Sequence, residues 1–178
     1  MAGDDPLRNP EQLMRRVYAY VAYRVGDPGE AEDITSETFE RALRYRGSFD
    51  PRKGDAVGWL LGIARNCLYD RQLRPREQAL VQEQPAAGDL EAEVIERLTL
   101  NQALAALSVN DRELLALRYG ADLRAREIAH LLDQRTNAVE VALSRARARL
   151  AAELEKSSRP PGRVGLPELA PDLADGVQ

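Results

Sequence analysis

Apolar residues recur every three or four positions through most of the chain, which is the spacing of amphipathic helices. In the first half this pattern predicts three helices, over residues 10–25, 28–45 and 56–73. Asn9 and Asp27 can cap the first two, and a proline follows each at the first helical position. Pro75 limits the third helix, and the Gly, Pro and Asp residues of 46–55 predict a loop before it. The expected buried positions are Leu13, Val17, Tyr20, Val21, Ala31, Ile34, Thr38, Phe39, Leu43, Trp59, Leu60, Ile63, Ala64 and Leu68.

A second block with the same periodicity begins near Ala92. It predicts a helix that ends before Ser108, then helices over 109–119, 124–132 and 137–154. Ser108 or Asn110 can cap the second of these, and Gly120 separates it from the third.

Residues 77–91 contain Pro, Gly and Gln with little periodicity, and they are expected to form a flexible linker. Residues 156–178 are rich in Pro and Gly and are expected to be a disordered tail. The sequence therefore predicts an all-α protein with two small helical domains, over 10–76 and 92–155.

Composition agrees with this fold and excludes several kinds of site. Aromatic residues make up 5% of the chain and charged residues 30%, and β-branched runs are scarce. The single cysteine, Cys67, cannot form an intrachain disulfide and is expected to be buried, while His130 has no Cys or His partner for a metal. There is no plausible nucleophile–base pair and no phosphate-binding glycine loop, so we expect neither an enzyme nor a cofactor.

The sequence also bears on where the protein acts. The first residues lack a basic start followed by an apolar core, so they do not form a signal peptide. No apolar run approaches the roughly 18 residues that a membrane-spanning helix needs. We therefore expect a cytoplasmic protein without membrane insertion.

Charge is strongly segregated, although the net charge is only −4. Residues 27–40 contain six acids and no base, residues 41–76 contain nine bases and three acids, and residues 77–98 contain six acids and one base. Any one of these blocks is compatible with an ordinary solvated helix surface. Together they indicate opposite faces on adjacent helices. All but two of the 25 basic residues are Arg, which forms bidentate contacts with phosphate and guanine.

Residues 123–149 carry the pattern of a helix-turn-helix. Leu123, Ile128, Ala129 and Leu132 form the apolar side of one short helix, and the small Ala129 allows another helix to cross closely. Thr136 can cap the next helix, whose apolar side is Val139, Leu143, Ala146 and Leu150. The four-residue turn between them fits this motif, and the polar face of the second helix suits a major groove. An ordinary helical hairpin is the alternative.

The two blocks together resemble the extracytoplasmic-function (ECF) sigma factors of bacterial RNA polymerase, over residues 11–76 and 100–150. The most specific stretch is EAEDITSETFERALR at 30–44, which is similar to the region 2 helix of the family. The stretch GWLLGIARNCLYDRQLR at 58–74 is similar to the helix that follows it in the family. Region 4 is represented by ALSVNDRELLALRY at 106–119 and by EIAHLL and AVEVALSRARARL within 127–150.

This resemblance implies binding to core RNA polymerase and to promoter DNA, with an anti-sigma factor as a further partner. The residues expected to contact polymerase are Glu32, Asp33, Glu37 and Glu40. The loop 47–55 and the helix after it are expected to capture the downstream (−10) element as it melts, through Arg46, Arg52, Lys53 and one helix face with Arg65, Asn66 and Arg71. Trp59 could stack on a base, but we expect it to belong to the core.

Region 4 is expected to read the upstream (−35) element as duplex DNA. The candidate contacts are Arg135, Thr136, Asn137, Glu140, Ser144, Arg145 and Arg147. Three positions depart from the family pattern. Asp133 stands where a glycine is expected in the turn, and Arg124 stands where a Ser or Thr is expected to cap the helix. Glu140 lies near a position where a basic residue is expected.

Two other functions remain open from the residues. A free-standing helix-turn-helix regulator would dimerise and bind an operator alone, but it leaves the acidic helix without a purpose. A sigma-like helical interaction protein is favoured by Glu140 and by the sequence pI of about 5.2.

Overall fold

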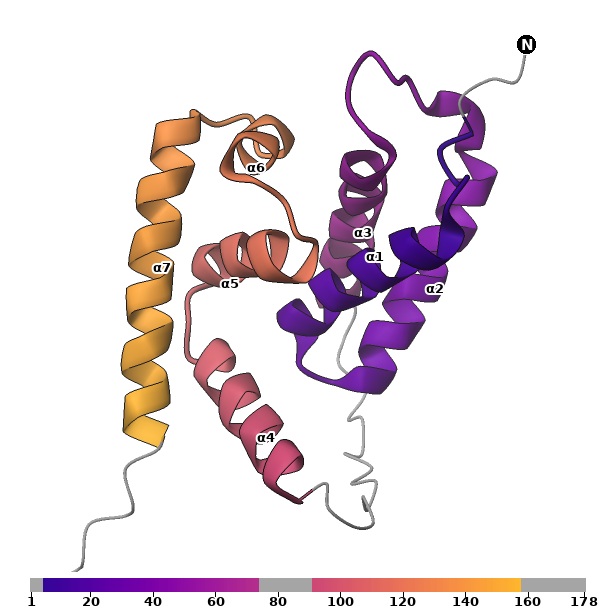
Figure 1. Ribbon diagram of the computed structural model, residues 1–178. Helices are drawn as coiled ribbons and strands as arrows, with labels where there is room; N and C mark the ends of the chain where they lie inside the picture. Colours follow the sequence, from indigo (N-terminus) through magenta and orange to yellow (C-terminus); the bar gives the residue numbers. More distant parts are fainter. Residues whose placement is uncertain (1–4, 74–90, 158–178) are drawn as a thin grey trace, which may run out of the picture.

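A computed structural model describes residues 5–73 and 91–157, and the regular structure in these ranges is helical (Figure 1). The N-terminal unit consists of α1 (Pro10–Val25), α2 (Pro28–Arg44) and α3 (Ala56–Leu73). The C-terminal unit consists of α4 (Glu91–Ala105), α5 (Val109–Leu115), α6 (Ala125–Leu131) and α7 (Thr136–Ser157). The all-α prediction is confirmed. Most of the expected linker and tail lies outside the described residues.

The helix boundaries of the N-terminal unit follow local signals. The Asp27 carboxylate accepts a hydrogen bond from the Glu30 N–H at 2.7 Å, so Asp27 caps α2 as predicted. The Asn9 side chain makes no capping hydrogen bond, which corrects that expectation for α1. Gly26 ends α1 in the left-handed conformation, with φ of 76°. The loop before α3 contains one short 3₁₀ turn, η1 (Arg46–Ser48).

The core of the N-terminal unit contains most of the apolar positions predicted for it. Val17, Tyr20, Ile34 and Leu60 are fully buried, and they come from all three helices. The buried Thr38 hydroxyl donates to the Ile34 carbonyl at 2.7 Å, so its polar group is satisfied inside the core. Leu43 was expected on the buried side but is 61% exposed, because in the last turn of α2 it is Ala42 that faces the core.

Trp59 and Cys67 lie where the sequence places them. Trp59 packs against the core, and its ring stands 5.5 Å from the Phe49 ring, centroid to centroid. Cys67 is buried in α3, and this burial raises the pKa of its thiol. These contacts agree with packing roles for both residues.

The C-terminal unit differs from the prediction at one helix end. Ser108 caps α5, since its hydroxyl accepts from the Asp111 N–H at 3.1 Å. The predicted helix over 109–119 does not stay α-helical. Its last turn widens into a π-helical segment, η2 (Ala116–Gly120), whose bond from Ala121 N–H to Ala116 C=O measures 2.9 Å.

The two units pack against each other through α1, α5 and η2 (Figure 1). One continuous apolar cluster contains Val17 of α1 and Leu60 of α3 together with Leu117 and Leu123 of the C-terminal unit. At Gly120 the backbones of η2 and α1 approach each other closely. A Cβ atom there would lie 2.8 Å from the Ala19 carbonyl oxygen and from two backbone atoms of Tyr20. The described chain therefore adopts a closed arrangement.

Candidate nucleic-acid and polymerase interfaces

The predicted polymerase-binding acids lie along α2. Glu32, Asp33 and Glu40 are exposed, and Glu32 and Glu40 form no ion pair with any described residue. Asp33 contacts Arg71 of α3 at 3.5 Å, and its side chain is 70% exposed. Glu37 differs, because it is half-buried and its carboxylate bonds Arg41 at 2.6 Å. The surface that α2 offers a basic partner therefore consists mainly of Glu32, Asp33 and Glu40.

The loop between α2 and α3 presents its bases to solvent. Arg46, Arg52 and Lys53 are all exposed, and the Arg52 side chain is 89% exposed. Arg52 bonds Asp50 at 3.0 Å, and this bond lowers the pKa of the Asp50 carboxyl. His130 of α6 donates from Nε2 to the Lys53 carbonyl at 2.8 Å. This hydrogen bond ties the loop to the C-terminal unit.

The helix residues expected to face the melted strand do not form one surface. Arg65 points to α5, where it bonds Glu113 at 3.1 Å. Arg71 turns to α2 and pairs with Glu30 at 3.6 Å as well as with Asp33. Asn66 is exposed. Arg65 and Arg71 therefore turn to different helices, α5 and α2, and do not share the one face that was expected for them.

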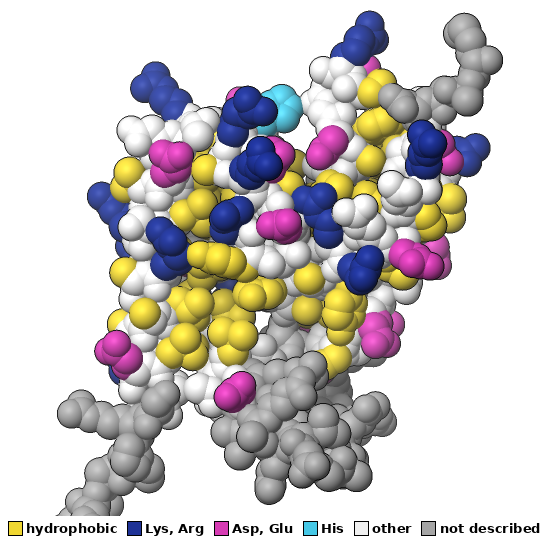
Figure 2. All heavy atoms as spheres, in the orientation of Figure 1, with side chains coloured by type: hydrophobic (Ala, Val, Ile, Leu, Met, Phe, Trp, Pro, Cys, Tyr) yellow, Lys and Arg dark blue, Asp and Glu magenta, His cyan; other side chains and the backbone are white. Residues whose placement is uncertain are grey.

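The helix-turn-helix motif is present as α6, a short turn and α7. All seven predicted upstream-element residues on α7 and the turn are exposed: Arg135, Thr136, Asn137, Glu140, Ser144, Arg145 and Arg147. The helix starts at Thr136, one residue earlier than expected. Figure 2 shows Lys and Arg side chains over the upper part of one face and along the edge formed by α7. The exposed side of α7 therefore remains free for a partner in the closed arrangement.

Two of the three departures from the family pattern have a structural account. Asp133 adopts φ of 52°, the left-handed conformation that glycine takes most readily, and the following Gln134 N–H bonds the Ala129 carbonyl at 2.8 Å. Arg124 precedes α6 and cannot accept from the helix N–H groups. The Glu127 carboxylate instead accepts from the Arg124 N–H at 2.6 Å, which is half of a capping box.

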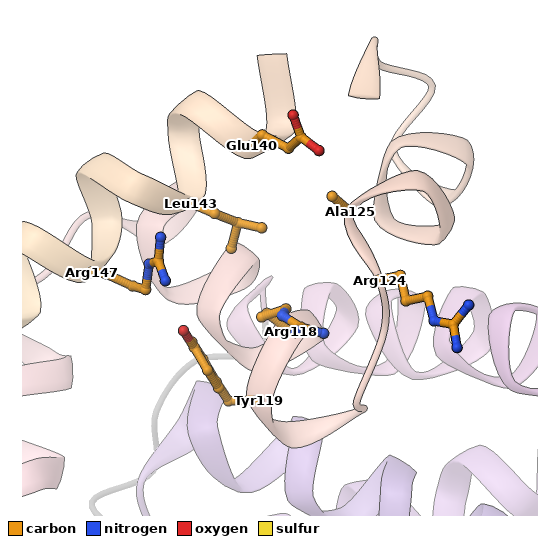
Figure 3. Close-up of a pocket in the computed structure, with 7 residues that line it drawn as sticks. All are labelled: Arg118, Tyr119, Arg124, Ala125, Glu140, Leu143 and Arg147. Atoms are coloured by element: carbon orange, nitrogen blue, oxygen red, sulfur yellow. The ribbon is translucent and has the colours of Figure 1, made fainter. Parts of the chain in front are cut away.

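Glu140, the third departure, lies at an open pocket of about 250 Å³. The pocket is lined by Arg118, Tyr119, Arg124, Ala125, Glu140, Leu143 and Arg147. Figure 3 shows that Glu140 points across this pocket toward the start of α6. Arg118, Arg124 and Arg147 line the same pocket, but Glu140 forms no ion pair with any described residue.

Replacing Asp133 by glycine is expected to raise the free energy of unfolding by roughly 0.5 to 1 kcal/mol, because glycine adopts positive φ without a Cβ penalty. Urea denaturation followed by circular dichroism measures this change. Asp133→Ala is the matched control at the same position and should lower stability. A glycine variant less stable than the wild type would contradict the left-handed turn.

A polar cluster joins the two units, and the sequence reasoning missed it. Its Tyr20, Arg24 and Glu113 side chains are largely buried, whereas the Arg65 side chain is 41% exposed. The Glu113 carboxylate of α5 accepts from the Tyr20 hydroxyl at 3.0 and 3.1 Å. It also pairs with Arg24 at 3.0 Å and with Arg65 at 3.1 Å. Burial, and then the Glu113 charge, raise the pKa of Tyr20 well above its ordinary value, so the phenol keeps its proton. No local sequence signal distinguishes Glu113 from the other acids of a charged helix.

In the part of the chain that the structure describes, no helix is long and apolar enough to cross a membrane. Within the same residues, no group of His, Cys, Asp and Glu side chains could hold a metal ion.

Comparison with known proteins identifies both units. Residues 11–77 match Sigma-70 region 2, and residues 97–150 match Sigma-70 region 4. The chain is 34% identical to the ECF RNA polymerase sigma factor BldN of Streptomyces coelicolor, over 84% of this chain and 60% of that protein's length. It is 32% identical to the ECF sigma factor SigC of Mycobacterium tuberculosis, over 78% of this chain and 77% of that one.

Two solved structures share the fold. One is the sigma factor RpoE of Bartonella quintana, in complex with the anti-sigma factor NepR. It has a TM-score of 0.59 and 23% identity, and the match covers 83% of this chain and 94% of that one. The other, CnrH in complex with the cytosolic domain of CnrY, has a TM-score of 0.60 and 24% identity, with 85% of each chain covered. The chain therefore belongs to the ECF RNA polymerase sigma factors, which direct RNA polymerase to promoters, and it contains sigma-70 regions 2 and 4.

Proposed function

We propose that this chain binds core RNA polymerase and directs initiation at promoters defined by an upstream and a downstream element. The observation that supports this proposal most strongly is that one chain combines an exposed acidic helix in region 2 with an exposed helix-turn-helix face in region 4. A free-standing regulator has no use for the first of these surfaces. Since core polymerase is a cytoplasmic enzyme, the protein acts in the cytoplasm.

Each surface suits its proposed partner chemically. Glu32, Asp33 and Glu40 of α2 offer carboxylates to a basic polymerase surface, and complementary charge speeds and orients docking. The exposed bases of the 46–53 loop suit a melted single strand, which favours a basic groove. On α7, Asn137 and Ser144 offer hydrogen bonds to base edges, while Arg145 and Arg147 can contact phosphates.

The assignment is tested by transcription in vitro. The purified chain is added to core RNA polymerase of its host, with host genomic DNA as template, and the 5′ ends of the transcripts are mapped. Discrete new start sites that share two sequence elements are expected. Polymerase binding without such transcripts would instead favour a sigma-like interaction protein, and specific DNA binding by the chain alone would favour a free-standing regulator.

Arg145→Ala is expected to weaken promoter binding by the assembled holoenzyme by about 1 kcal/mol or more, and to reduce the slope of log affinity against log salt by about one. The reason is that Arg145 is exposed on α7 and forms no ion pair with a described residue. Filter binding or fluorescence anisotropy over a salt series measures both quantities. Arg15→Ala removes an exposed charge from α1 and serves as the control. Equal behaviour of the two variants would exclude Arg145 from the DNA surface.

We further propose an anti-sigma factor as a partner, supported by the fold shared with the sigma factor RpoE of Bartonella quintana, whose structure was solved in complex with the anti-sigma factor NepR. Such a protein would have to cover the α2 acids or the α7 face. Co-expression with candidate partners and loss of transcription in vitro would test this point separately.

A further inference from the structure

The polar cluster between the two units has the form of an oxyanion site. Its donors, Tyr20, Arg24 and Arg65, all belong to the N-terminal unit, and the acceptor Glu113 belongs to the C-terminal unit. The Tyr20 side chain is fully buried, and the Arg24 side chain is only 10% exposed. Glu113 itself is 13% exposed. One unit thus supplies a preformed set of hydrogen-bond donors, and the other supplies the acid that fills it.

Glu113 does not exhaust this site. Two guanidinium groups face a single carboxylate. Arg24 Nη1 also donates to the Val109 carbonyl at 3.0 Å, and the buried Arg24 Nε has no hydrogen-bond partner among the residues that the structure describes. An unpaired donor at a buried position is rare, and it indicates capacity for another acceptor atom. A phosphate group offers more oxygens than a carboxylate and matches the planar donor geometry of arginine.

We propose that Tyr20, Arg24 and Arg65 form a binding site for a backbone phosphate of nucleic acid, which Glu113 occupies while the two units are closed. The inference rests on the proposed function, because the phosphate belongs to the nucleic-acid strand that region 2 is proposed to bind and replaces Glu113 at Arg65. The two occupants exclude each other, since both need the same donors. Strand binding at this site and contact of region 4 with α1 are therefore coupled in opposite directions.

The choice of phosphate over an acidic protein segment follows from the surroundings of the site. Arg65 lies in the segment 41–76, which contains nine bases and three acids. The exposed Arg46, Arg52 and Lys53 belong to the same segment. The exposed bases of this segment offer repeated positive charges, which suit the regular charge of a nucleic-acid backbone.

The test measures binding of a fluorescein-labelled single-stranded oligodeoxynucleotide to the full chain at low salt, by anisotropy. Glu113→Gln keeps the size of the side chain but removes the competing charge, so it is expected to bind about tenfold more tightly than the wild type. Glu155→Gln makes the same change of net charge at an exposed position of α7, and it should change the affinity little. The gain should vanish in the double variant Glu113→Gln with Arg65→Ala, and with a neutral methylphosphonate backbone.

Several outcomes would overturn the inference. Affinity in Glu113→Gln equal to that in Glu155→Gln, or a gain that survives Arg65→Ala, excludes the proposed site. Equal displacement of the oligonucleotide by polyglutamate would assign the site to acidic protein segments instead. Because loss of one partner from a buried ion pair destabilises proteins, folding is checked by circular dichroism. If Glu113→Gln does not fold, Glu113→Asp keeps the charge on a shorter side chain and should give a smaller gain, whose absence overturns the inference.

The same proteins separate this inference from the proposed function. If the wild-type chain initiates transcription but Glu113→Gln does not bind the oligonucleotide more tightly, the proposed function stands and only the phosphate site is rejected. A wild-type chain that never initiates contradicts the proposed function, whatever the oligonucleotide binding shows.

Discussion

Gly120→Ala is expected to separate the two helical units. The added Cβ would lie 2.8 Å from the Ala19 carbonyl oxygen and from the N and Cα atoms of Tyr20. These are backbone atoms in the interior of α1, so no side-chain rotation can relieve the overlap. Either α1 and η2 move apart or the closed fold loses about 1 to 3 kcal/mol of stability, which is the usual effect of overpacking.

Two measurements distinguish these results. Small-angle X-ray scattering should show a larger radius of gyration when the units separate, and urea denaturation should show the loss of stability. Gly62→Ala is the matched control, because beyond its neighbours in the chain and the nearby backbone of α3 no described atom lies within 4 Å of its Cβ position. It should raise stability by up to about 1 kcal/mol, as expected for Gly to Ala inside a helix. A Gly120→Ala chain with wild-type size and stability would contradict the close approach.

The closed arrangement masks the two DNA-reading regions unequally. Arg65 of region 2 is engaged by Glu113, and the Lys53 carbonyl is bonded to His130. The α7 residues proposed for the upstream element are all exposed. Opening the units also uncovers apolar residues such as Leu117, which belongs to the shared cluster. Opening therefore needs compensating contacts, and those with polymerase and the melted strand can supply them.

Helix positions could be predicted from the sequence because their signals are local. The helices over 10–25 and 56–73 begin and end as expected, since prolines and polar residues define the ends. The expectation of a glycine at position 133 also has a local cause, because the backbone of Asp133 adopts the left-handed conformation. Even the exposure of most α2 acids follows from their spacing.

Contacts between distant segments could not be predicted in this way. From the sequence, Gly120 was expected only to separate two helices. In the structure it packs against the backbone of Tyr20, and a side chain there would disrupt this contact. Glu113 reads as one more solvated charge, because the three donors around it lie far away in the sequence. The π-helical end of α5 lies at the same interface, since η2 carries Gly120 and packs on α1. Tertiary packing at this interface overrides the local pattern.

Asp33→Arg is expected to reduce the affinity for core RNA polymerase by about tenfold to a hundredfold. Like charges placed face to face across an interface cost several kcal/mol, and each tenfold change in affinity corresponds to about 1.4 kcal/mol. The fold should tolerate the change. Asp33 is largely exposed, and its contact with Arg71 at 3.5 Å is a surface pair of the kind that contributes little. Fluorescence titration with labelled chain measures the affinity.

Glu11→Arg provides the control, since it makes the same charge reversal at an exposed site at the start of α1. It should change stability by only a few tenths of a kcal/mol and leave polymerase affinity unchanged. If Asp33→Arg binds polymerase like this control, α2 is not the docking surface.

The combination with Gly120→Ala decides the order of events. Asp33 is exposed in the closed arrangement, so polymerase can dock on α2 before the units separate. Gly120→Ala alone should therefore leave docking intact and favour the later contact with the melted strand. The double variant should dock as poorly as Asp33→Arg alone, because opening the interface does not restore the lost charge complementarity. Recovery of polymerase affinity in the double variant would show instead that polymerase binds only the open form.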